Sequence, residues 1–200
     1  MCKGTRSLGG LERTDGVTLV ELLIVVAIVA VLASIGVPSY VSAVANYRIL
    51  TEVNGLVGDL QYARSEAVKQ GMTVQMCIST DGQTCSTSAV SWAAGHVVVA
   101  SPPGSDCTRV GGGCTLLRAQ PAFSGTDSGL PTPSTQTSIA FGRDGFAGTS
   151  SGTWNGFSPL AQSVVLTVRA VPDISGLGNC VLINTVGQIS VLARGTAPCT

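Results

Sequence analysis

The sequence predicts an α+β fold, in which one long N-terminal helix precedes a β-rich globular head. Three observations lead to this prediction. An apolar run covers residues 17–37, an amphipathic pattern of helical period covers 38–71, and alternating patterns separated by turn residues occupy 72–200. A helix followed only by antiparallel strands is the element order of an α+β protein.

The run from Val17 to Val37 is apolar except at three positions, Thr18, Glu21 and Ser34. A helix over this run would be about 30 Å long, enough to cross the hydrocarbon core of a bilayer. A carboxylate at the bilayer centre costs about 2.5–3.5 kcal/mol, and somewhat less near the interface. We therefore expect the carboxylate of Glu21 to have a partner.

Residues 1–16 contain charged residues but neither an apolar stretch nor an Ala-x-Ala cleavage site. An ordinary secretory signal loses its apolar region on cleavage. A cut between Gly16 and Val17 would instead leave the apolar run as the mature N-terminus. The new amine of Val17 could then pair with Glu21, within one chain or between staggered neighbours. The alternative is an uncleaved signal anchor with Glu21 at the level of the lipid headgroups.

The segment Gly16-Val17-Thr18-Leu19-Val20-Glu21-Leu22-Leu23-Ile24 resembles the cleavage and methylation motif of type IV prepilins and type II secretion pseudopilins. Pro38 and Tyr40 fall where pilins carry the proline and tyrosine that end the membrane segment. Val17 stands where most of these proteins have Phe, and the leader of residues 1–16 is long for the group. The resemblance implies a pilin-like fold and a prepilin peptidase that cuts after Gly16 and methylates the amine of Val17. It also implies packing with other pilins through the N-terminal helix, with Glu21 setting the register.

The amphipathic stretch 38–71 is expected to continue the helix and to end at Gly71, because apolar residues recur there at three- and four-residue steps. A bend or loosened turn is expected at residues 54–58, which contain two glycines. The charged residues are expected on the remaining, exposed side: Arg48, Glu52, Asp59, Arg64, Glu66 and Lys69. The stretch Asp59-Leu60-Gln61-Tyr62-Ala63-Arg64-Ser65-Glu66-Ala67 resembles the GspH/FimT branch of minor pilins and pseudopilins.

Strands are predicted within the head wherever β-favouring residues alternate between turn signals. The predicted strands are 72–79, 95–100, 114–119, 137–142, 163–170, 179–185 and 188–193. Stretches rich in Gly, Ser, Thr and Pro are predicted to be surface loops: 101–113, 124–136 and 148–159.

The chain has seven cysteines, of which Cys2 lies in the expected leader. The other six form an even set, as expected in a compartment where disulfides form. Their spacing suggests three local loops, Cys77–Cys85, Cys107–Cys114 and Cys180–Cys199, although sequence alone does not choose among the pairings. A zinc site is the alternative, but the chain has no C-x-x-C motif and one histidine.

The sequence does not favour an enzyme, a metal site or a cofactor. The histidine, His96, lies in a strand-like segment, where a half-buried structural role is expected. No nucleophile elbow or phosphate loop is present. A Ser/His/Asp triad assembled from distant residues is the alternative that sequence leaves open.

DNA binding is the rival function, because some FimT-like minor pilins use a Gly-Arg-x-Arg motif on the final hairpin in DNA uptake. The matching segment here is Gly187-Gln188-Ile189-Ser190, which lacks both arginines. The chain has 11 basic and 11 acidic residues, so its charge does not suggest a surface for polyanions.

These observations together predict a minor type IV pilin or type II secretion pseudopilin. Residues 1–16 would be the cleaved leader, 17–37 the membrane and assembly helix, 38–71 its continuation and 72–200 the periplasmic head. The protein would first lie in the bacterial inner membrane with a single pass and then enter, or prime, a pilus or pseudopilus. The sequence does not distinguish these two filaments.

Overall fold

The computed structural model describes residues 16–86, 88, 91–102, 114–150, 157–171 and 176–199. The expected leader lies outside these residues except for Gly16. The chain divides into a first unit, Met1–Val41, and a second unit, Ser42–Thr200.

Helix α1 extends from Leu19 to Gln70 and contributes to both units. The hydroxyl of Thr18 accepts a hydrogen bond from the Glu21 N–H at 3.2 Å, which satisfies one backbone donor of the first turn. Gly71 adopts φ 66°, the left-handed conformation that commonly ends a helix.

The bend or loosened turn expected at residues 54–58 does not interrupt α1, which is helical without a break from Leu19 to Gln70. Leu56 and Leu60 are fully buried on either side of Gly58. Tertiary packing of the apolar face therefore outweighs the low helix propensity of the glycines.

In the first unit, the side chains from Val17 to Val41 are exposed. This part of α1 is long and apolar enough to cross a membrane. An apolar helix surface of this size is stable only in contact with lipid or with other apolar helices.

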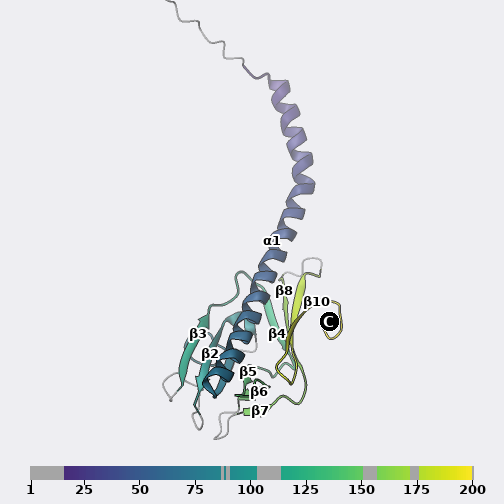
Figure 1. Cartoon of the computed structure of the whole chain (residues 1–200). Helices are drawn as coiled ribbons and strands as arrows, with labels where there is room; N and C mark the ends of the chain where they lie inside the picture. The colour runs from purple at the N-terminus through teal and green to yellow at the C-terminus, as the bar shows by residue number, and fades with distance from the viewer. Residues whose placement is uncertain are drawn as a thin grey trace, which may run out of the picture. The chain divides into compact units, whose positions relative to one another are not determined.

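The second unit contains two antiparallel sheets (Figure 1). The six-stranded sheet has the order β3-β2-β1-β5-β6-β7, and the four-stranded sheet has the order β10-β9-β8-β4. The strands are β1 Thr73–Ile78, β2 His96–Ser101, β3 Thr115–Gln120, β4 Ser128–Thr132, β5 Ser138–Phe141, β6 Ala147–Ser150, β7 Phe157–Pro159, β8 Val164–Arg169, β9 Gly178–Ile183 and β10 Ile189–Ala193, with a short 3-10 helix η1 at Trp92–Ala94.

Three of these strands lie in stretches that were expected to be loops. Strand β4 falls within 124–136, and β6 and β7 fall within or overlap 148–159. Their sequences are short and contain glycine or proline, so local propensity argues against strands. Pairing decides their conformation instead: β4 pairs with β8, and β6 lies between β5 and β7.

The main core forms where the C-terminal half of α1 meets both sheets (Figure 1). The helix contributes Ile49, Val53, Leu56, Leu60, Ala63 and Ala67. The cluster includes Met76 and Phe141 from the six-stranded sheet and Leu166 and Ile183 from the four-stranded sheet. The α+β architecture with a helix packed on a β-rich head is thus confirmed.

Candidate assembly site and helix–head contacts

The residues predicted to direct processing and assembly lie together at the start of α1. Gly16 and Val17 precede the helix, and Glu21 is in its first turn. All three are exposed, and none of the described residues contacts the Glu21 carboxylate through a hydrogen bond or an ion pair. A carboxylate in the first turn of a helix is stabilised by the backbone N–H groups there.

The charged residues in the second half of α1 bind the head. Arg48 donates two hydrogen bonds to Asp127 at 2.5 and 2.7 Å, and the Asp127 side chain is fully buried. These bonds raise the pKa of Arg48. One turn further along, Glu52 accepts hydrogen bonds at 2.9 Å from both the N–H and the hydroxyl of Ser124. Helix α1 thereby holds both ends of residues 124–127.

Asp59, expected on the exposed side of the helix, is buried with 1% of its surface accessible. Its two carboxylate oxygens contact His96 on β2 at 2.8 Å and Arg118 on β3 at 2.5 Å. Burial alone would raise the pKa of Asp59, but the hydrogen bonds from His96 and Arg118 outweigh it and lower that pKa. The prediction that Asp59 faces solvent is wrong, because a buried charge is tolerated when it is paired and hydrogen-bonded, here with the buried His96 and the partly exposed Arg118.

His96 is more buried than the half-buried position expected for it, with 3% of its surface exposed. Its Nε2 atom faces an ionised carboxylate, so this nitrogen carries a proton. Arg118 also stacks over the ring of Tyr62, with 4.2 Å from the guanidinium carbon to the ring centroid. These contacts join α1 to two neighbouring strands, which is a structural role for His96.

Arg64 joins the last turns of α1 to two loops of the head. Its guanidinium donates to the carbonyl of Gly145 at 3.0 Å and to that of Val186 at 3.3 Å. Both loops turn at glycines with positive φ, Gly145 at 78° and Gly187 at 79°. A Cβ atom at Gly187 would collide with the Gly145 carbonyl, so the close approach of the two loops needs glycine there.

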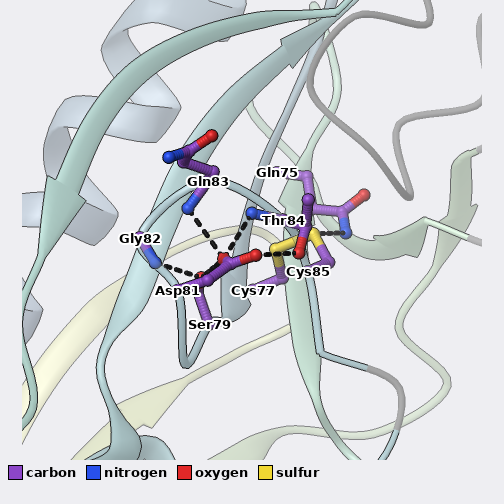
Figure 2. The surroundings of a disulfide bond; sticks show 8 residues. All are labelled: Gln75, Cys77, Ser79, Asp81, Gly82, Gln83, Thr84 and Cys85. Atoms are coloured by element: carbon purple, nitrogen blue, oxygen red, sulfur yellow. Dashed lines mark hydrogen bonds between the residues drawn. A yellow bond between two sulfur atoms is a disulfide. The ribbon is translucent and has the colours of Figure 1, made fainter.

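The first disulfide joins Cys77 on β1 to Cys85 and closes a short loop. Within this loop, the Asp81 carboxylate faces the backbone N–H groups of Gln83 and Thr84 (Figure 2). Hydrogen bonds from the hydroxyl and N–H of Thr84 hold the pKa of Asp81 well below its usual value. The loop is thus fixed both by a covalent bond and by a carboxylate-centred turn.

The second disulfide joins Cys180 on β9 to Cys199 and ties the end of the chain to the four-stranded sheet. Cys114 is also disulfide-bonded, whereas its suggested partner, Cys107, lies outside the described residues. The cystines belong to two small apolar clusters apart from the main core. One contains Cys77, Val97, Val99 and Cys114, and the other contains Val165, Cys180 and Cys199.

No group of three or more His, Cys, Asp or Glu side chains in the described part of the chain could hold a metal ion. The histidine of the chain, His96, is buried and bound to the buried Asp59. This pair joins the helix to the six-stranded sheet.

Sequence reasoning missed the polar contacts between α1 and the head. Arg48 and Asp127 are 79 positions apart, and Asp59 and Arg118 are 59 apart. One signal was available: the Asp59–Ala67 segment that resembles the GspH/FimT branch includes both Asp59 and Arg64. A charged residue within such a motif deserves consideration as a packing contact.

Comparisons with known proteins agree with the motif and the fold. Residues 13–37 match the prokaryotic N-terminal methylation motif. The structure is similar to the type IV minor pilin FimU of Pseudomonas aeruginosa, with a TM-score of 0.52 and 17% identity over 72% of this chain and 87% of that one. The minor pseudopilin EpsH of the Vibrio cholerae type 2 secretion system has a TM-score of 0.48 and 12% identity, over 74% of this chain and 98% of that one.

No curated protein matches the chain significantly. The likeness to FimU shows a shared pilin fold. Residues 52–187, more than half of the chain, match the family described as type II transport protein GspH. Together with the methylation motif at its N-terminus, this match shows that the chain belongs to the GspH family of minor pilins and pseudopilins.

Proposed function

We propose that this chain is a non-enzymatic subunit that enters or primes a type IV pilus or a type II secretion pseudopilus. A prepilin peptidase cuts after Gly16 and methylates the amine of Val17. The 17–37 helix holds the protein in the bacterial inner membrane with residues 72–200 in the periplasm. It then packs with the N-terminal helices of other pilins.

The observation that carries this proposal is the exposed apolar surface of α1 from Leu19 to Val41, with Glu21 in the first turn. A membrane anchor alone needs the apolar surface but not the acid. Pairing of Glu21 with the Val17 amine of a neighbouring subunit would offset the cost of a carboxylate in an apolar environment. The disulfides of the head support an oxidising compartment.

Intact-mass analysis of the protein extracted from membranes tests the processing step. In cells with an active prepilin peptidase, we expect a chain that begins at a methylated Val17. Cells without the peptidase provide the control and should retain residues 1–16. A full-length species in both strains would contradict the proposal.

Replacing Glu21 with Ala tests the assembly step separately. Glu21→Ala removes a polar group from the apolar span, so membrane insertion should be retained, while incorporation into sheared filaments should fall several-fold. Ser34→Ala is the matched control, because it removes another polar side chain from the apolar span and leaves both Glu21 and its hydrogen bond to Thr18 in place. Incorporation of Glu21→Ala at the wild-type level would rule out the pairing.

A further inference from the structure

Strand β10 is an edge of the four-stranded sheet, and its open side can be identified from two hydrogen bonds. The Asn184 N–H donates to the Gln188 carbonyl at 3.1 Å, and the Arg194 N–H donates to the Gly178 carbonyl at 3.3 Å. In an antiparallel ladder every second residue bonds to the neighbouring strand. The even-numbered residues of β10 therefore face β9, and the odd-numbered ones direct their N–H and C=O groups outward: Ile189, Val191 and Ala193.

The outward groups of Ile189 and Val191 have no hydrogen-bond partner among the described residues, while the Ala193 carbonyl accepts from the Thr196 N–H. Val191 has 46% of its surface exposed. Ile189 lines a pocket of about 700 Å³ together with Gln61 and Val68 of α1. A pocket therefore lies between the helix and this end of β10, where Ile189 also packs against the main core.

The other three sheet edges carry features that discourage pairing with another strand. Strand β3 contains the charged Arg118 and has a bulge against β2. Strand β4 contains Pro131, and the short strand β7 ends in Pro159. Strand β10, with the sequence ISVLA, has no charge and no proline, and its pairing with β9 has no bulge.

We propose that this edge binds a second copy of the chain through antiparallel pairing of the two β10 strands. A twofold axis at Val191 would place each Val191 opposite its counterpart, and each Ile189 opposite Ala193 of the other copy. These pairs are apolar throughout. Each Arg194 would face Gln188 of the other copy, so the two arginines would not repel each other.

The proposed pairing also joins the outward backbone N–H groups of each β10 strand to backbone carbonyls of the other. Val191 of each copy would donate to and accept from Val191 of the other, and the Ala193 N–H would donate to the Ile189 carbonyl. The two four-stranded sheets would become one continuous sheet. This contact uses no residue of the 17–37 helix, so it is independent of the proposed filament packing.

Cysteine cross-linking of the full-length protein in detergent micelles tests the proposal. Two paired Val191 residues would have Cα atoms about 5.5 Å apart, within the range for a disulfide. We expect Val191→Cys to give a covalent dimer on a non-reducing gel after mild oxidation. Leu130→Cys on the edge strand β4 is the matched control, because it is exposed but next to Pro131. Equal dimer yields from the two variants, or none from Val191→Cys, would overturn the proposal.

A second variant keeps the native cysteine set. Val191→Lys places a charge on the open edge and leaves the bonds to β9 in place, so the head should still fold. Native mass spectrometry should detect a dimer of the wild-type chain that falls several-fold in Val191→Lys, with unchanged circular dichroism. A monomeric wild-type chain, or the same dimer fraction in a folded Val191→Lys variant, would show that β10 does not pair.

Discussion

The carboxylate of Asp59 is shared by two groups on different strands, the imidazole of His96 and the guanidinium of Arg118. A buried carboxylate in this setting stabilises the fold only while it is ionised. Its lowered pKa means that the folded chain keeps Asp59 charged at pH values where the unfolded chain begins to protonate it. Asp59 therefore makes the helix–head contact sensitive to acid.

We expect this contribution to be fully present above the unfolded pKa of about 4 and to be lost as the pH falls through the lower folded pKa. Asp59→Asn should lower the free energy of unfolding at neutral pH by about 2 kcal/mol, because charged hydrogen bonds become neutral ones. It should also flatten the loss of stability below about pH 4. Urea unfolding of the full-length chain, followed by tryptophan fluorescence, measures both effects. Parallel pH profiles for the variant and the wild type would contradict this role.

At the scale of the elements, the Cys180–Cys199 disulfide attaches the segment after β10 to strand β9. The two cysteines of this disulfide are 19 residues apart in the sequence, whereas Cys77 and Cys85 are 8 residues apart. The Cys180–Cys199 bond should therefore restrict the unfolded chain more. Cys199 is fully buried and packs with Val165 in a cluster outside the main core. The C-terminal segment is thus part of the packing of the sheet.

The double variant Cys180→Ala/Cys199→Ala should lower the free energy of unfolding by about 3 kcal/mol. Cys77→Ala/Cys85→Ala is the comparison and should have a smaller effect, because its loop is shorter. Chemical unfolding of the oxidised full-length proteins gives both values. An equal or larger loss from the Cys77/Cys85 variant would show that loop length does not govern the effect.

The elements that sequence predicted well have strong local patterns. Val74, Met76 and Ile78 alternate with residues on the opposite face of β1, and this alternation is found in the structure. Helix α1 ends before Gly71, as expected. Strands such as β4 could not be predicted, because its pairing with β8 depends on residues more than 30 positions away.

The candidate site likewise contains residues that the sequence predicts and contacts that it does not. Gly16, Val17 and Glu21 lie close together in sequence, so a local motif identifies them. Contacts such as Arg48–Asp127 need the fold before the partners can be named.

At the scale of the whole molecule, the described cations are largely engaged within the protein. Arg48 and Arg118 contact carboxylates, Arg64 contacts backbone carbonyls, and Arg169 donates to the hydroxyl of Ser128. Lys69 pairs with Glu66. A nucleic-acid surface instead needs cations directed at solvent in a patch. The contacts of the head therefore favour a structural subunit.

We expect the full-length protein to bind double-stranded DNA only weakly, with a Kd of about 10⁻⁴–10⁻⁶ M at physiological salt. Gln188→Arg/Ser190→Arg on the final hairpin should bind more tightly and with a steeper salt dependence, because new phosphate contacts release counterions. Gln188→Ala/Ser190→Ala is the uncharged control. Fluorescence anisotropy at two salt concentrations measures all three proteins. Tight, salt-sensitive binding by the unmodified chain would favour a role in DNA uptake.

The polar contacts of Arg48, Glu52, Asp59 and Arg64 have a mechanical consequence. Their positions on α1 span about 24 Å at the helical rise, and they join the helix to three parts of the head: residues 124–127, strands β2 and β3, and the two loops at Gly145 and Val186. A tension along the helix axis would act on these contacts simultaneously, as shear, because none can separate before its neighbours have also begun to slide. The head would then resist traction on its N-terminal helix more strongly than peeling of the helix from one end, which would break the same contacts one after another.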